Sequence, residues 1–154
     1  METVFDPALH ISLECQVTRH VVDLLRREQL ALQQADISAV DPLIQEKTYQ
    51  LQQLAQLADA RKQWIATLGH GLDREGTEKA FRDCPDAAAA WMELIDLAKT
   101  AVQINKINGL IIDRHLRHNQ RILRELRTAT RATALYGSDG QPRPISPVRQ
   151  LGEG

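Results

Sequence analysis

Residues able to hold a metal occur in two helical pairs. His10 and Glu14 are four residues apart, and His115 and His118 are three apart, so each pair would share one face of a helix. A catalytic zinc site needs three protein ligands and a structural zinc site needs four. Two ligands do not make a site, and we expect neither a metal nor any other cofactor.

Motifs of the common enzyme classes are missing from the sequence. It contains no Glu-x-x-His pair of the di-iron bundles, no phosphate-binding loop, no HExxH and no nucleophile motif around Ser or Cys. Cys15 and Cys84 stand alone rather than in a CxxC, which favours two buried, reduced thiols over a disulfide. We therefore expect a binding protein and not an enzyme.

Arginines gather in the segment "RHLRHNQRILRELRTATR" near the end of the last predicted helix. Cations favour the C-terminal end of a helix, and acidic residues stand near the start of the same helix. A solvated face accounts for this pattern, and the alternative is a patch for an acidic partner. The net charge of −1 does not support a nucleic-acid binder. The arginines concerned are Arg114, Arg117, Arg121, Arg124 and Arg127.

Composition predicts one all-helical domain. The chain has 154 residues, 43% of them hydrophobic and only 4% aromatic, and alternating strand patterns are almost absent. No apolar run approaches the roughly 18 residues of a membrane helix, and the first ten residues lack the basic start and apolar stretch of a signal peptide. We expect a cytoplasmic protein.

Capping residues predict three long helices and one short helix. Asp6-Pro7 and Asp41-Pro42 are start signals, for helices ending near Ala35 and Leu68, and Pro85 begins the third long helix. A short helix is expected at 77–83. Short connections make these helices an elongated antiparallel bundle, coiled-coil-like in its spacing. Residues 1–136 form the helical domain, and the Pro- and Gly-rich residues 137–154 are expected to be a flexible tail.

The last long helix carries an apolar seam with polar interruptions. Its seam positions alternate four and three residues apart and include Asn105, Gly109 and Asn119, which are poor helix formers. Other apolar residues lie off this seam, so the helix either packs against both other helices or keeps a stripe for a partner. The seam positions are Trp91, Ile95, Ala98, Val102, Asn105, Gly109, Ile112, Leu116, Asn119, Leu123 and Leu126. The off-seam residues are Leu97, Ile104, Ile107, Leu110 and Ile111.

Charged residues are also predicted inside the bundle. The seam of the second helix contains two cations, Lys47 and Arg61, and Glu28 continues the apolar face of the first helix. Folding these helices back on each other brings Glu28 level with Lys47, and folding on the third helix brings Lys47 near Asn105. We predict a structural polar layer of Glu28, Lys47 and Asn105 that sets helix register. The alternative is that Lys47 extends to solvent.

Two short motifs occur in the last predicted helix and at its end. The first is "NKING" followed by apolar residues, from Asn105 through Asn108 and Gly109 to Ile112, and the second is "LYGSDGQ" at 135–141. In this order the two motifs resemble the FlgN family of flagellar type III export chaperones. Glu28, Lys47 and Trp91 support the resemblance, which spans nearly the whole chain. It implies a cytosolic helical chaperone that binds hook-associated (hook–filament junction) proteins and delivers them to the export gate.

The resemblance also implies where partners bind. The end of the last helix and the segment that follows it would engage the client, and Tyr136 would contact the cytoplasmic domain of the export-gate membrane protein. The alternative for Tyr136 is that it packs at the helix end, with Gly137 as the cap. The expected client-binding residues are Asn105, Asn108, Gly109, Ile112, Ile122, Leu123 and Leu126. For Asn105 and Asn108, internal register and client docking both remain open at this stage.

A structural homo-oligomer is the alternative function. In that case the seam and the spare apolar residues of the last helix would pair with a second copy of the chain.

Overall fold

The computed structural model describes residues 4–136, with side-chain exposure through residue 132. Four helices follow one another: α1 (Pro7–Gln33), α2 (Ile37–Thr67), α3 (Arg74–Ala80) and α4 (Pro85–Tyr136). This confirms the predicted all-α class with three long helices and one short one. The chain divides into two units, residues 1–112 and 113–154, so α4 contributes to both. The expected tail at 137–154 lies outside the described residues. No helix in the described part is long and apolar enough to cross a membrane.

The first helix begins where the sequence predicts. The Asp6 side chain accepts a hydrogen bond from the Leu9 N–H at 3.2 Å, and Pro7 occupies the first helical position. Pro has no N–H to lose there, and its fixed φ suits a helix start. These short-range effects are sufficient to place this end of α1.

The second helix begins five residues before the predicted Asp41-Pro42 start. Ala35 takes a left-handed conformation with φ 54°, and Asp36 then caps α2 by accepting from the Ala39 N–H. Pro42 consequently lies inside α2, where its ring nitrogen cannot donate to the carbonyl four residues earlier. The extra turn is stabilised by burial, because Ala39, Val40 and Leu43 pack against Leu24 and Ala31 of α1.

The short helix also begins earlier than predicted, at Arg74 rather than near residue 77. Asp73 is its cap and accepts a hydrogen bond from the Gly76 N–H at 2.8 Å. Gly76 is buried against the preceding loop: a Cβ added there would lie 1.8 Å from the Gly71 carbonyl oxygen. The loop can therefore close on α3 only because residue 76 has no side chain.

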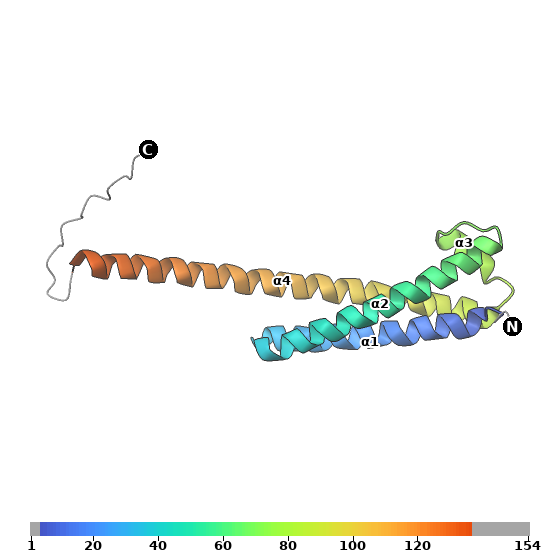
Figure 1. The fold of residues 1–154 in the computed structure, drawn as a ribbon, viewed down its shortest axis with the longest axis horizontal. Coiled ribbons are helices and arrows are strands. Elements are labelled where there is room, and N and C mark those ends of the chain that lie inside the picture. Colours follow the sequence, from blue (N-terminus) through green and yellow to red (C-terminus); the bar gives the residue numbers. More distant parts are fainter. Residues whose placement is uncertain (1–3, 137–154) are drawn as a thin grey trace, which may run out of the picture. The chain divides into compact units, whose positions relative to one another are not determined.

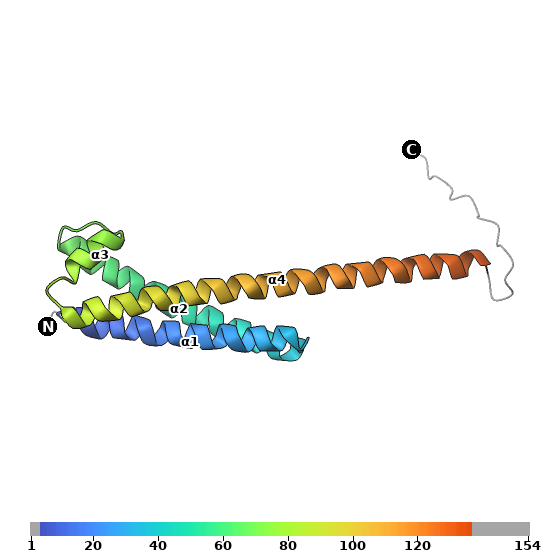
Figure 2. The same cartoon turned by 180° about the vertical axis from the view of Figure 1, so that it is seen from behind.

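The first unit is a bundle of α1, α2 and the first half of α4. Contacts pair Glu14 with Arg61 and Glu28 with Lys47, so α1 and α2 are antiparallel. The Cys15 thiol of α1 donates a hydrogen bond to the Ala90 carbonyl of α4, and the Asn108 amide of α4 donates one to the Leu25 carbonyl of α1. Residue numbers therefore rise together along the two helices, so α4 runs in the same direction as α1. Figures 1 and 2 show α1 beside this part of α4 from both sides, with α3 joining the end of α2 to the start of α4.

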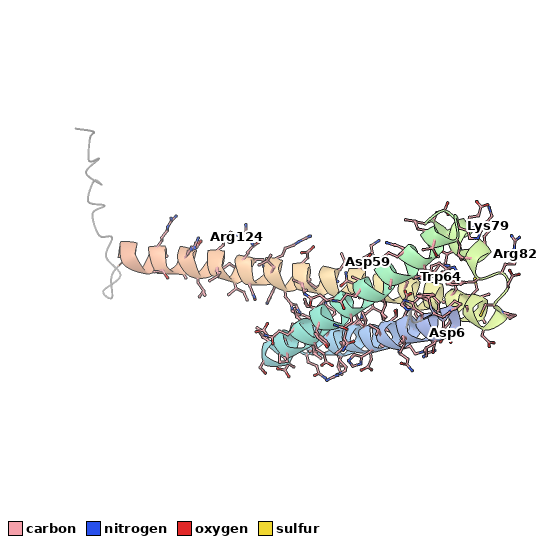
Figure 3. All side chains as sticks on the ribbon, turned by 45° about the vertical axis from the view of Figure 1, so that its right-hand side comes forward. Asp6, Asp59, Trp64, Lys79, Arg82 and Arg124 are labelled. Carbon is pink, nitrogen blue, oxygen red and sulfur yellow. The ribbon has the colours of Figure 1, made fainter. Side chains whose placement is uncertain are left out.

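The largest apolar cluster lies at the end of the bundle where α1 begins. Trp64 lies there, on the end of α2 and close to the start of α1 at Asp6 (Figure 3). Its ring stacks between those of Phe5 and Phe81, with centroid distances of 4.8 and 5.8 Å, and Trp91 meets Phe81 edge-on. Each such aromatic pair contributes about 0.5–1.5 kcal/mol beyond the area it buries. The buried residues of this cluster are Ile11, Cys15, Phe81, Ala87 and Leu94.

The packed face of α4 is one position away from the predicted seam. Leu94 and Asn108 are buried, whereas Asn105, Gly109 and Ile112 are exposed. Of the off-seam residues, Leu97, Ile104 and Ile111 are partly buried, and Ile107 and Leu110 are exposed. Apolar side chains surround this part of the helix almost completely, so spacing alone does not select the face that α1 and α2 cover.

Two glycine substitutions should shift stability in opposite directions. We expect Gly76→Ala to destabilise the fold by about 1–3 kcal/mol, because the new methyl group forces the loop away from α3. Gly109→Ala should stabilise it by about 0.5–1 kcal/mol, since alanine is the better helix former and a Cβ there meets nothing within 4 Å among the described residues. Urea unfolding followed by circular dichroism measures both. Equal effects of the two substitutions would contradict the close approach at Gly76.

Candidate functional site

One polar layer joins the three long helices near residue 28. Lys47 donates to a Glu28 carboxylate oxygen at 2.6 Å, and the Asn108 amide donates to the other oxygen at 3.1 Å. The same Asn108 amide also donates to the Leu25 carbonyl at 3.0 Å. We call this set the Glu28 layer. The asparagine in it is Asn108, buried to 1% exposure, and not the predicted Asn105. This follows from the shift of the α4 face by one position.

A second polar layer lies nearer the start of α1. The Arg61 guanidinium donates to both carboxylate oxygens of Glu14, at 2.8 and 3.2 Å, and stacks 4.8 Å from the centre of the Trp91 ring. Glu14 is only 1% exposed. His10 lies beside it, and its Nε2–H donates to the Leu57 carbonyl oxygen at 2.7 Å, because that oxygen can only accept. We call Glu14, Arg61 and Trp91 the Glu14 layer. The carboxylate of the His10 and Glu14 pair is thus engaged by an arginine.

Sequence reasoning missed the Glu14 layer, although a signal for it was present. Glu14 and Glu28 are fourteen residues apart on α1, and Lys47 and Arg61 are fourteen apart on α2. Fourteen residues is two heptads, so both members of each pair lie on the same face of their helix. In an antiparallel pair, any register that aligns Glu28 with Lys47 therefore also aligns Glu14 with Arg61.

The predicted client residues of the first unit have different surroundings. Asn105 is exposed, Gly109 faces open space, and Ile112 is 46% exposed. Asn108 is buried against α1, so its side chain does not face solvent. The Asn108 Oδ1 atom is buried without a hydrogen-bond partner among the described residues. The structure therefore places one predicted residue inside the bundle and three on its surface.

The part of α4 that belongs to the second unit exposes large apolar side chains. Leu116, Leu123 and Leu126 are each more than half exposed, and Ile122 is 44% exposed. We call these four residues the C-terminal stripe. Six arginines lie between residues 113 and 132 against two carboxylates, Asp113 and Glu125, and Arg124 projects away from the helix (Figure 3). Tyr136 is the last residue of α4, and nothing is described of its side chain.

The described residues offer little for metal or thiol chemistry. Among them, no three His, Cys, Asp or Glu side chains are grouped so as to hold a metal ion. Cys15 and Cys84 are free; Cys15 is buried as expected, whereas Cys84 is only partly buried. Burial raises the pKa of the Cys15 thiol, and the negative charge of Glu93 raises it further. A reactive cysteine needs a lowered pKa and access to solvent, so Cys15 is an inert core residue.

Comparisons of the sequence with protein families and with known proteins point to the same family. Residues 8–144 match the model of the FlgN protein family. A flagella synthesis protein FlgN of Proteus mirabilis is 26% identical over 133 residues, which cover 85% of this chain and 86% of that protein. The Yersinia enterocolitica protein of the same name is 32% identical over 66 residues, covering 43% of this chain and 44% of that protein.

A solved structure is also similar. A crystal structure from Pseudomonas aeruginosa, described as a flagella synthesis protein FlgN, superposes with a TM-score of 0.65 at 26% identity. The match covers 72% of this chain and 91% of that one.

Removing one charge of the Glu14–Arg61 pair should destabilise the fold more than removing both charges. Arg61→Leu leaves a buried carboxylate unpaired, and we expect it to lower the free energy of unfolding by about 3–5 kcal/mol. Glu14→Leu combined with Arg61→Leu should recover most of that loss, because no charge is then stranded. Urea unfolding of the single and double variants tests this. As a control, Arg19→Leu breaks the exposed ion pair with Glu93 and should have a much smaller effect. Additive losses from Glu14→Leu and Arg61→Leu would argue against the buried pair.

Thiol labelling should report the burial of Cys15. In a Cys84→Ser variant at pH 8, we expect Ellman's reagent to react with Cys15 only as the protein unfolds, because the thiol is buried and its pKa is raised. The labelling rate should therefore rise with urea in parallel with the loss of helical signal. If Cys15 were labelled as fast in the folded variant as in the unfolded chain, the result would contradict its burial in the structure.

Proposed function

Because this chain belongs to the FlgN protein family, we propose that it is a cytoplasmic export chaperone for flagellar hook-associated proteins. The family consists of non-enzymatic flagellum synthesis chaperones, and membership implies hook-associated proteins as partners. In this proposal the chaperone keeps these junction proteins from assembling prematurely and delivers them to the flagellar type III export gate.

The C-terminal stripe carries this proposal. Its four apolar side chains are spaced three, four and seven residues along one helix and remain exposed. An amphipathic client helix could bury them with its own apolar face, which is a common mode of helix recognition. A disordered client segment that folds on binding gives up part of the interaction energy to ordering, so it can be released at the export gate.

The arginines around the stripe favour a client over self-association. Two copies of the segment would bring together two sets of six arginines, each balanced by only two carboxylates. Like charges across an interface disfavour that pairing, whereas acidic residues on a client would favour binding. The structural homo-oligomer is therefore the weaker alternative.

The remaining predicted residues keep separate roles in the proposal. Asn105, Gly109 and Ile112 offer an exposed surface in the first unit that a client could also contact. Asn108 acts indirectly, by holding α4 to α1 through the Glu28 layer. Tyr136 remains the candidate contact for the cytoplasmic domain of the export-gate membrane protein, as the family resemblance implies.

Calorimetric titration with the C-terminal segment of a hook-associated protein from the same genome tests the proposal. We expect saturable binding with a negative heat-capacity change, as apolar burial requires. Leu123→Glu with Leu126→Glu should weaken binding by about tenfold or more, since charged groups would replace buried apolar ones. Both side chains are exposed, so the fold should be unaffected.

A matched control lies on the same helix. Thr128 is exposed and lies on the other side of α4 from Leu123, so Thr128→Glu should leave client affinity unchanged. Absence of binding by the unaltered protein would reject the chaperone proposal. A tight oligomer seen by light scattering and lost in the Leu123→Glu, Leu126→Glu variant would favour the homo-oligomer instead.

A further inference from the structure

An apolar groove lies in the first unit, apart from the C-terminal stripe. It has a volume of about 350 Å³ and runs between α2 and α4, with Val21 of α1 at its base. One wall contains Leu51, Leu54 and Ala58 of α2, and the other contains Ile95 and Val102 of α4. The Glu14 layer lies at one end, because Glu14, Arg61 and Trp91 also line the groove. We call this space the interhelical groove.

Side chains at the mouth of the groove remain exposed although they are apolar. Leu51 is 46% exposed and Val102 is 69% exposed. The α4 wall extends from Trp91 to Val102, which is about 16 Å at 1.5 Å per residue, or roughly three turns of a helix. A fourth helix placed there would cover these side chains and complete a four-helix arrangement with α1, α2 and α4.

The charged neighbours of four apolar residues that line the groove are all cations. Residues three or four positions away on a helix are surface neighbours. At those spacings from Leu51, Ala58, Ile95 and Val102, every charged residue is a cation. These neighbours are Lys47, Arg61, Lys62, Lys99 and Lys106.

Two of these cations are already neutralised inside the bundle. Lys47 pairs with Glu28, and Arg61 pairs with Glu14. The other three, Lys62, Lys99 and Lys106, are exposed, and none of them has an ion pair with another described residue. The groove is therefore lined mainly by apolar residues and bordered by three lysines that have no ion pair within residues 4–136, in a chain whose net charge is −1.

We propose that the interhelical groove binds an acidic amphipathic helix of a partner protein, with its apolar face between α2 and α4 and its carboxylates on Lys62, Lys99 and Lys106. This surface is additional to the proposed client surface on the C-terminal stripe. A second copy of the chain is a poorer occupant, because the cations bordering the two grooves would repel each other.

A pair of synthetic peptides tests the proposal directly. Each has three heptads with leucine at positions a and d, and the flanking e and g positions are glutamate in one peptide and lysine in the other. Like charges keep each peptide from pairing with itself at pH 7. We expect the glutamate peptide to bind the full chain at a single saturable site by fluorescence anisotropy, and the lysine peptide to bind at least about tenfold more weakly.

Two variants and one control locate the binding site. Val102→Glu should weaken binding of the glutamate peptide by about tenfold or more. Because the Val102 side chain is highly exposed, the substitution should leave the fold intact, which circular dichroism would verify. Changing Lys62, Lys99 and Lys106 together to Glu should reverse the preference between the two peptides. Leu123→Glu, on the C-terminal stripe, should leave both affinities unchanged.

Several results would overturn the groove proposal. These are equal affinities for the two peptides, no saturable binding of the glutamate peptide, or binding that depends on Leu123 rather than Val102. A dimer that is lost in Val102→Glu would assign the groove to a second copy of the chain. Because no flagellar client is used, the outcome is independent of whether the chaperone proposal holds.

Discussion

The pairing of two buried carboxylates with two cations is the constraint on which the first unit depends. Glu14 and Glu28 on α1 are nearly inaccessible to water, so each needs a cation at the same level of α2. Arg61 and Lys47 meet that need together, since the two spacings are equal. Sliding α2 by one turn would break both pairs at once. Buried ion pairs add little net stability compared with apolar packing, but such a penalty on misalignment helps to define a single register.

The same two layers also position α4. Asn108 of α4 bonds to Glu28, and Trp91 of α4 lies over the Arg61 guanidinium. These contacts are seventeen residues apart along α4, so they fix which face of this helix meets α1 and α2. Polar residues in the interior thus determine which apolar residues are left on the surface. In the first unit, the exposure of Ile107, Leu110 and Ile112 of α4 follows from this choice of face.

Two helix starts that depend on neighbouring residues could be predicted from the sequence, whereas the face of α4 that packs in the bundle could not. The Asp6-Pro7 start of α1 and the Pro85 start of α4 depend on neighbouring residues only, and the structure confirms both. The Asp41-Pro42 prediction was wrong because the packing of Val40 and Leu43 against α1 outweighs the local signal for a helix start at that point. Asn105 was chosen over Asn108 because apolar residues surround α4 there, and only the partner Glu28 distinguishes the two. Leu116, Leu123 and Leu126 of the C-terminal stripe were predicted as seam positions and Ile122 as a client-binding residue, but the partner of the stripe cannot be derived from spacing.

The aromatic cluster at the start of α1 has a consequence for optical spectroscopy. Trp64 and Trp91 are the only two tryptophans of the chain, and both lie against Phe81. Intrinsic fluorescence therefore reports the environment at this one end of the bundle, whereas far-ultraviolet circular dichroism reports every helical residue. The two signals together distinguish fraying of α4 from opening of the bundle: the first removes ellipticity while the emission maximum stays constant, and the second changes both.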